Sequence, residues 1–177
     1  MLKPWRKKWF LKKRSFKRSL RDSHVYTILG KRAFHPKLWK SDRRSVAGGV
    51  AVGLFTAFTP TIPFHMLLAA VGSILFRVNM PLALAACWVT NPLTAVPIFV
   101  AARNVGKTML THHEPVVAFI TLFTPDGKMG TVIREGLYLT SGSLVFATLA
   151  AATGYLAVLG LWKIAEHAAA IKRLFRK

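Results

Sequence analysis

Three long stretches without a charged side chain constrain this sequence more than any other feature. Residues 45–76, 78–102 and 137–162 contain no Lys, Arg, Asp or Glu over 32, 25 and 26 positions. A helix that crosses about 30 Å of hydrocarbon needs about 20 apolar residues, so each stretch is long enough. Because soluble proteins rarely hold three such stretches in 177 residues, we expect an all-α polytopic membrane protein.

The charged residues lie outside these stretches and are mostly basic. The chain has 26 Lys and Arg against 6 Asp and Glu, a net charge of +20, and 16 of the basic residues lie within residues 1–44. With 53% hydrophobic residues and one cysteine, Cys87, the composition excludes a disordered tail, a disulfide scaffold and an ordinary cytosolic enzyme. We expect a basic segment over 1–44, a membrane domain over 45–162 with a polar loop at 103–136, and a basic tail over 163–177.

The first apolar stretch is too long for one crossing, because 32 helical residues would extend about 48 Å. It is interrupted by Thr59-Pro60-Thr61-Ile62-Pro63. Two prolines three residues apart remove two hydrogen-bond donors and clash with the preceding turn, so a helix should break here. Two geometries fit: a broken spanning helix, or a re-entrant hairpin with both ends on one side.

The second apolar stretch repeats this design with a break predicted from Thr90 to Pro97, containing Pro92 and Pro97. The two breaks lie about thirty residues apart, and both follow a Gly/Ala-rich segment, which makes a weak internal repeat. Paired interrupted segments are typical of a midplane binding site in transporters. The competing interpretation is a pair of kinked helices whose prolines are only structural.

The breaks predict a particular chemistry. Asn91 before Pro92 is typical of an N-cap followed by the first helical residue, and Thr61 and Thr94 are further candidate caps. A half-helix that begins inside the membrane presents unpaired N–H groups and a positive dipole end, which suit an anionic group. The candidate binding residues at the breaks are Thr59, Thr61, His65, Thr90, Asn91 and Thr94.

His65 is the residue of the first two stretches that titrates near neutral pH, and it is a candidate proton carrier or a buried neutral histidine. Arg77 and Arg103 mark the ends of the second stretch, where they either extend to the headgroups or contact a lipid phosphate. We include both in the candidate substrate-binding set.

Small residues predict close helix packing in two places. Gly49 and Gly53 form a G-x-x-x-G pattern in the first stretch. In the third stretch, small residues recur along an uninterrupted segment that is long enough for one full span: Gly142, Ala147, Ala151 and Gly154.

The basic N-terminal segment has aromatic residues at helical spacing among its Lys and Arg. Its predicted lipid-surface residues are Trp5, Arg6, Lys7, Lys8 and Trp9, followed later by Arg43 and Arg44. The pattern predicts an amphipathic helix on an anionic membrane surface, and the adjoining apolar stretches favour lipid over nucleic acid. The tail over 163–177 predicts a second, shorter surface helix.

The charge distribution also predicts the topology. The first stretch begins too late for a cleaved signal peptide, so we expect the N-terminus to be retained. Basic residues favour the cytoplasmic side, which places residues 1–44 and 163–177 inside and residues 103–136, at net +1, outside. One of the first two stretches must therefore span, and the other must return to its own side.

Catalytic and metal-binding patterns are absent from the sequence. Residues 45–102 contain no carboxylate, and the adjacent His112, His113 and Glu114 cannot easily converge on one metal. We expect no enzyme activity, no catalytic residue, no metal and no cofactor. The expected partners are anionic membrane lipids and, given the small spanning core, further copies of the chain, rather than nucleic acid.

Two segments of the chain resemble a bacterial membrane family catalogued as domain of unknown function 2062. They are HPKLWKSDRRSVAGGVAVGLFTAFTPTIPFHM (His35–Met66) and LFRVNMPLALAACWVTNPLTAVPIF (Leu75–Phe99), and the Gly-rich C-terminal helix is similar as well. The chain has His65 where that family usually has Gln, and Asp42 where it usually has Asn. The resemblance implies a multi-pass protein of the bacterial inner membrane and brings no established activity.

Two functions follow from these observations. The first is transport or handling of an anionic, lipid-borne substrate at the two breaks. The second is a scaffold without catalysis that binds anionic lipid or partner proteins through its basic ends.

Overall fold

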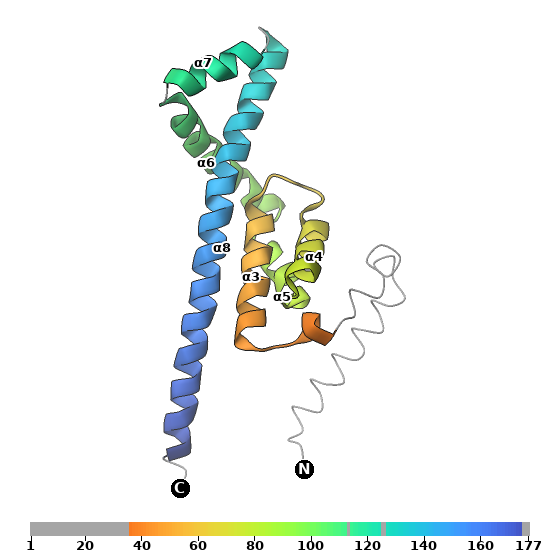
Figure 1. Cartoon of the computed structure of the whole chain (residues 1–177), viewed down its shortest axis with the longest axis vertical. Coiled ribbons are helices and arrows are strands. Elements are labelled where there is room, and N and C mark those ends of the chain that lie inside the picture. The colour runs from red at the N-terminus through yellow and green to blue at the C-terminus, as the bar shows by residue number, and fades with distance from the viewer. Residues whose placement is uncertain (1–35, 113, 125–126, 175–177) are drawn as a thin grey trace, which may run out of the picture.

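The computed structural model describes residues 36–112, 114–124 and 127–174, and all regular elements among them are helical. In chain order they are η2 (Pro36–Trp39), α3 (Arg43–Phe58), α4 (His65–Phe76), α5 (Met80–Cys87), α6 (Pro92–Thr111), α7 (Glu114–Phe123) and α8 (Lys128–Leu174). Figure 1 shows α3, α4 and α5 as a compact group beside the long helix α8. Helix α6 crosses α8, and α7 connects α6 to the start of α8.

The first apolar stretch forms a hairpin of two antiparallel helices. Helix α3 ends at Phe58 because Pro60 forces the preceding residue out of the helical region, and Thr59 has ψ 135°. Helix α4 then runs back along α3: Gly72 lies against Val52, and the chain returns to the start of α3 beyond Arg77. Of the two geometries open to this stretch, the structure has the hairpin.

The second apolar stretch changes direction by 77° between α5 and α6. The break covers Trp88 to Asn91, and α6 begins at Pro92, where a missing N–H costs nothing. The prediction that Pro97 breaks the helix is wrong, because Pro97 lies inside α6. As the sixth residue of α6, Pro97 removes one hydrogen bond of a helix that continues to Thr111 and packs against α8.

Helix α8 is continuous over 47 residues, about 70 Å at 1.5 Å per residue. It corrects two predictions. The tail up to Leu174 continues α8 instead of forming a separate surface helix, because no Pro or Gly separates Trp162 from the Ala-rich segment that follows. Residues 103–136 are mostly helical rather than a loop, since their mixed charges do not prevent α6, α7 and the start of α8 from forming.

Helix α8 packs on two partners. Its N-terminal part crosses α6, and its central part runs antiparallel to α3, where Phe146 meets Phe58 edge-to-face with ring centroids 6.4 Å apart. Further along, Gly154 contacts Val50 and Leu54 of α3. Figure 1 shows that α6, α7 and the start of α8 enclose a triangle beyond the α3–α4–α5 group.

The interior is made of small residues, and the surface carries large apolar ones. Alanines dominate the tightly buried positions, each at most 1% exposed: Ala47, Ala57, Ala69, Ala83, Ala102 and Ala147. Leu, Phe, Val and Ile side chains are exposed on α4, α6 and α8. This distribution is typical of helices that pack in lipid, where small residues allow close approach.

One described helix, α8, is long and apolar enough to cross a membrane, and the bent pair of α5 and α6 passes the same test as a single unit. Only 6% of the most apolar part of α8 is buried within the protein, so α8 is not the covered core helix of a globule. The structure and the composition together indicate a membrane-associated protein.

Candidate functional site

A close contact between α3 and α5 positions both breaks. A Cβ atom on Gly49 or Gly53 would overlap the carbonyl oxygen of Asn79 or Ala83, so the two backbones are as close as glycine allows. At the next turn, the Thr56 hydroxyl donates to the Cys87 sulfur at 3.6 Å. Helices α3 and α5 are therefore parallel and lie about thirty residues apart in sequence, which is the spacing of the weak internal repeat.

This arrangement brings the two breaks to the same end of the α3–α4–α5 group. Thr56 and Cys87 each lie in the last turn of a helix that leads directly into a break. Residues of both breaks therefore lie close together although they are far apart in the sequence.

Some backbone carbonyl and N–H groups at the first break find hydrogen-bond partners within the break and the last turn of α3. The Thr59 hydroxyl donates to the carbonyl of Phe55 at 2.8 Å, and the N–H of Phe64 donates to the carbonyl of Thr61 at 2.6 Å. Helix α4 has no side-chain cap at its N-terminus. The Thr61 hydroxyl and the His65 Nδ1 atom are enclosed and have no hydrogen-bond partner among the described residues.

The second break is capped by its own side chains. The Asn91 side chain accepts hydrogen bonds from the N–H groups of Leu93 and Thr94 at 2.9 and 3.1 Å. The Thr94 hydroxyl in turn accepts from the N–H of Asn91 at 3.0 Å, which completes a capping box. Thr90, 3% exposed, has a buried hydroxyl without a partner among the described residues.

The capping box corrects the prediction of unpaired amides at the start of α6. Pro92 has no N–H, Leu93 and Thr94 donate to the Asn91 side chain, and Ala95 donates to the Asn91 carbonyl at 2.8 Å. Asn91 and Thr94 therefore occupy the donors that an anion would need. The sequence identified Asn91 as a cap, but the consequence for ligand binding required the full hydrogen-bond pattern.

Five basic side chains from four segments gather at the opposite end of the group, and we term them the basic end: Lys40, Arg43, Arg44, Arg77 and Lys163. Asn79 joins three of these segments. Its N–H donates to the Ser45 carbonyl at 3.0 Å, and its Nδ2 donates to the Lys40 carbonyl at 2.9 Å. Arg77 is two residues away in the chain, so it is held near Lys40 and the start of α3.

Lys163 lies at the same level as the start of α3. Gly154 of α8 contacts Leu54, and the two antiparallel helices rise about 1.5 Å per residue, so Lys163 is about 14 Å and Arg44 about 15 Å from that contact. The described acids at this end are Asp42, whose carboxylate lies 3.7 Å from the Lys40 ammonium, and Glu166, which accepts a hydrogen bond from Trp162.

Asn79 was not predicted from the sequence. It is 4% exposed, caps α5 by accepting from the N–H of Leu82 at 3.1 Å, and precedes Pro81 by two residues. The same signal that identified Asn91, an Asn just before a helix with proline in its first turn, could have found it.

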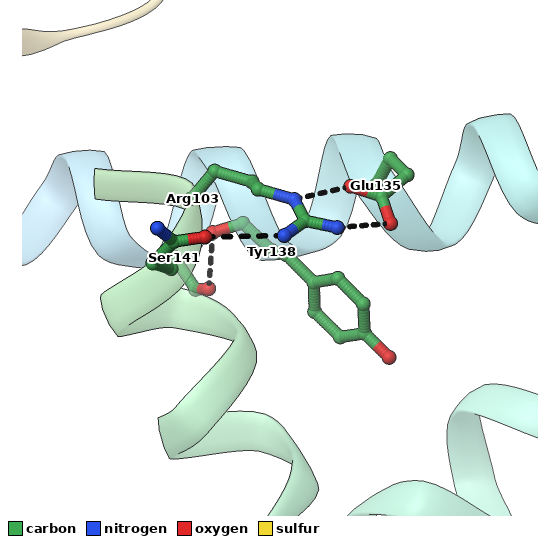
Figure 2. Close-up of polar contacts among 5 residues, drawn as sticks. Arg103, Glu135, Tyr138 and Ser141 are labelled. Carbon is green, nitrogen blue, oxygen red and sulfur yellow. Dashed lines mark hydrogen bonds and ion pairs between the residues drawn. The ribbon is translucent and has the colours of Figure 1, made fainter. Parts of the chain in front are cut away.

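Arg103, predicted to bind substrate, is engaged in an ion pair between α6 and α8. Its Nε and Nη2 atoms donate to the two carboxylate oxygens of Glu135 at 2.5 and 2.7 Å, and Figure 2 shows this paired contact above Tyr138 and Ser141. The helices are in backbone contact here, because a Cβ on Gly106 or Gly142 would overlap a carbonyl oxygen of the other helix. Arg103 thus belongs to the crossing of α6 and α8.

The other predicted residues are distributed as follows. Pro60 and Pro63 lie in the linker between α3 and α4, and Pro92 is the first residue of α6. Trp5, Arg6, Lys7, Lys8 and Trp9 lie outside the described residues, as does His113. Within the described part of the chain, no group of three His, Cys, Asp or Glu side chains could hold a metal ion.

The chain matches the model of a known protein family. A bacterial family described as "uncharacterized protein conserved in bacteria", domain of unknown function 2062, matches residues 27–170 of the chain. No curated protein and no solved structure matches this chain.

Proposed function

This chain belongs to the uncharacterised bacterial family of domain of unknown function 2062, so we propose its function from its geometry. We propose that it is an integral membrane protein that binds anionic phospholipid headgroups at its basic end. It acts there as a scaffold. The observation that carries this proposal is the gathering of cations from four segments beside exposed apolar side chains. Leu75 and Phe76 directly precede Arg77 and are 72% and 71% exposed.

The proposal places the protein in the bilayer as follows. The α3–α4 hairpin enters and leaves the bilayer on the side of the basic end. The bent α5–α6 pair crosses the bilayer once, and α8 crosses it back to the side of the basic end. Both ends of the chain then lie on one side, and the excess of Lys and Arg makes that side the cytoplasm. The ion pair of Arg103 and Glu135 lies beyond the apolar part of α8, at the opposite surface.

A native mass spectrometry experiment tests the proposal. The full chain is purified in detergent and exposed to equal amounts of phosphatidylglycerol and phosphatidylcholine. We expect phosphatidylglycerol to bind preferentially, and replacement of Lys40, Arg43 and Arg44 by Gln to reduce that preference roughly tenfold or more, because each cation near an anionic surface contributes about 1 kcal/mol.

The matched control removes three charges at the other end of the molecule, where Lys107, Lys128 and Arg134 are replaced by Gln. This variant should retain the lipid preference. Equal binding of both lipids by the parent chain, or an equal loss in both triple variants, would contradict the proposal. Charge reversal within residues 3–21 measures separately what the N-terminal segment contributes.

A second function, handling of a polar group at the two breaks, is favoured by one specific observation. The Thr61 and Thr90 hydroxyls and the His65 Nδ1 atom are enclosed without partners among the described residues, and such groups are rare unless something else satisfies them. This function no longer relies on free amides at α6.

The substitution Thr90→Val tests this second function, because it keeps the shape of the side chain and removes only the hydroxyl. If Thr90 is merely structural, loss of an unsatisfied hydroxyl should leave stability equal or higher and cellular function unchanged. If the hydroxyl contacts a ligand, a growth or transport phenotype of a strain that depends on this protein should be lost while membrane localisation is retained.

A further inference from the structure

Arg77, between α4 and α5, has an unusual backbone conformation. It has φ 54° and ψ 41°, and it is the one non-glycine residue with positive φ in the described part of the chain. Its N–H caps the end of α4 by donating to the carbonyls of Ile74 and Ser73. Glycine is the usual residue at such a cap, because any Cβ is strained in the left-handed region. The arginine therefore carries a backbone strain that glycine at this position would not have.

Nothing in the described part of the chain uses that side chain. Arg77 is exposed, and its guanidinium makes no hydrogen bond or ion pair with a described residue. Its position is nevertheless well defined, because Asn79 fixes the turn through hydrogen bonds to Ser45, Lys40 and Leu82. A fixed turn that presents an unpaired guanidinium is suited to an external partner.

The neighbours of Arg77 indicate the chemistry of that partner. Leu75 and Phe76 expose large apolar surfaces next to the charge, and Lys40, Arg43 and Arg44 add further positive charge nearby. Asp42 is the described acid at this site, and it lies within 3.7 Å of Lys40. A partner that matches both features has an anionic head directly joined to apolar chains.

We infer that Arg77 is a phosphate-binding residue for a single anionic phospholipid, whose acyl chains lie against Leu75 and Phe76. The planar guanidinium pairs with two phosphate oxygens at once, which an ammonium group cannot do. This inference rests on the proposed function, since it assigns one residue and one lipid phosphate to the basic end.

The test uses the full chain in detergent and measures phosphatidylglycerol binding by native mass spectrometry. Arg77→Asn removes the charge and tolerates the left-handed backbone, and Arg134→Gln removes one charge far from the basic end. Arg77→Asn should weaken binding about fivefold, as expected for one cation at an anionic surface, whereas Arg134→Gln should change it less than twofold. Arg77→Lys should give an intermediate loss because it keeps the charge and loses the paired contact.

A stability measurement separates ligand binding from folding. Arg77→Gly should unfold at the same temperature as the parent chain or about 2–4 °C higher, because it relieves the strained cap. It should lose lipid affinity to the same extent as Arg77→Asn. A lower unfolding temperature for Arg77→Gly would overturn the inference, since the arginine would then be needed for the fold.

Two further outcomes distinguish the sources of failure. If the parent chain has no preference for phosphatidylglycerol, the proposed function fails and this inference fails with it. If the preference exists and Arg77→Asn behaves like Arg134→Gln, only the assignment to Arg77 is wrong. Competition by soluble glycerol phosphate at the same concentration as the lipid would show a site for free phosphate and would also overturn the inference.

Discussion

The first apolar stretch folds back on itself between α3 and α4, whereas the second continues from α5 into α6 through a bend of 77°. Both breaks contain Thr, and each has a proline within it or directly after it, so prolines alone do not decide the outcome. The linker from Thr59 to Phe64 has six residues, and α4 begins at His65 without a side-chain cap, which leaves room for a full reversal. In the second break, Asn91 starts a new helix only four residues after α5 ends, and the short linker limits the change of direction. Linker length and capping therefore separate a reversal from a bend.

The difference between the two stretches is tested most directly by finding on which side of the membrane each helix end lies. Cysteines introduced at Ser41, Arg77 and Met129, with Cys87 replaced by Ser, can be labelled with an impermeant maleimide in vesicles of known orientation. The hairpin predicts all-or-none labelling, with the Ser41 and Arg77 positions on one side and the Met129 position on the other. Labelling of the Arg77 position together with the Met129 position would mean that the first stretch spans.

The largest expected effect on stability concerns the contact that aligns the two regions. Gly53→Ala places a Cβ into the carbonyl of Ala83 and should destabilise the fold by about 3 kcal/mol, because the backbones must separate. Gly160→Ala is the matched control, since nothing lies within 4 Å of that position, and it should be neutral or slightly stabilising. Thermal unfolding in detergent compares the two variants, and equal midpoints would refute the contact.

The two asparagine caps should differ in strength. Asn79→Ala removes a helix cap and a hydrogen bond between segments, and it should cost about 2 kcal/mol. Asn91→Ala removes only the cap of α6 and should cost about 1 kcal/mol, and Asn91→Ser should recover most of it. Denaturant or thermal unfolding can rank these variants, and a larger loss for Asn91→Ala would reverse the roles assigned to the two turns.

The smallest effect should come from the ion pair at the crossing of α6 and α8. Both side chains are more than a third exposed, so Glu135→Gln should change the unfolding midpoint very little. The difference in stability between the parent chain and the variant should shrink as salt is added, because salt screens the ion pair. Glu166→Gln serves as the control, and a loss for Glu135→Gln as large as that for Asn79→Ala would indicate a buried, structural pair.

Local features of this protein were predictable from neighbouring residues. The C-terminal end of α3 and the start of α6 follow from Pro60 and Asn91-Pro92, since these act on the backbone within one turn. The glycines at 49 and 53 indicated a close helix contact for the same reason. Pro97 was misjudged because a single proline near the start of a long, well-packed helix is tolerated, and the packing is not visible in the sequence.

Features that depend on segments far apart were not predictable. The direction in which α4 returns, the partner of Gly53 and the pairing of Arg103 with Glu135 each join residues that are twenty or more positions apart. Asn79 was overlooked because its importance comes from carbonyl groups of Lys40 and Ser45, which only the folded chain brings within hydrogen-bond distance.

Taken alone, the amino-acid order establishes that this chain is helical, that it carries apolar stretches long enough for a bilayer, and where its helices are interrupted, because these properties depend on side-chain polarity and on backbone restrictions within a few residues. The tertiary structure decides that the first stretch reverses and that Asn91 and Thr94 satisfy the first amides of α6. It also decides that Asn79 joins Lys40, the start of α3 and the turn of Arg77. These properties depend on which backbones can approach each other, and that is determined by the small residues at the contacts between distant helices.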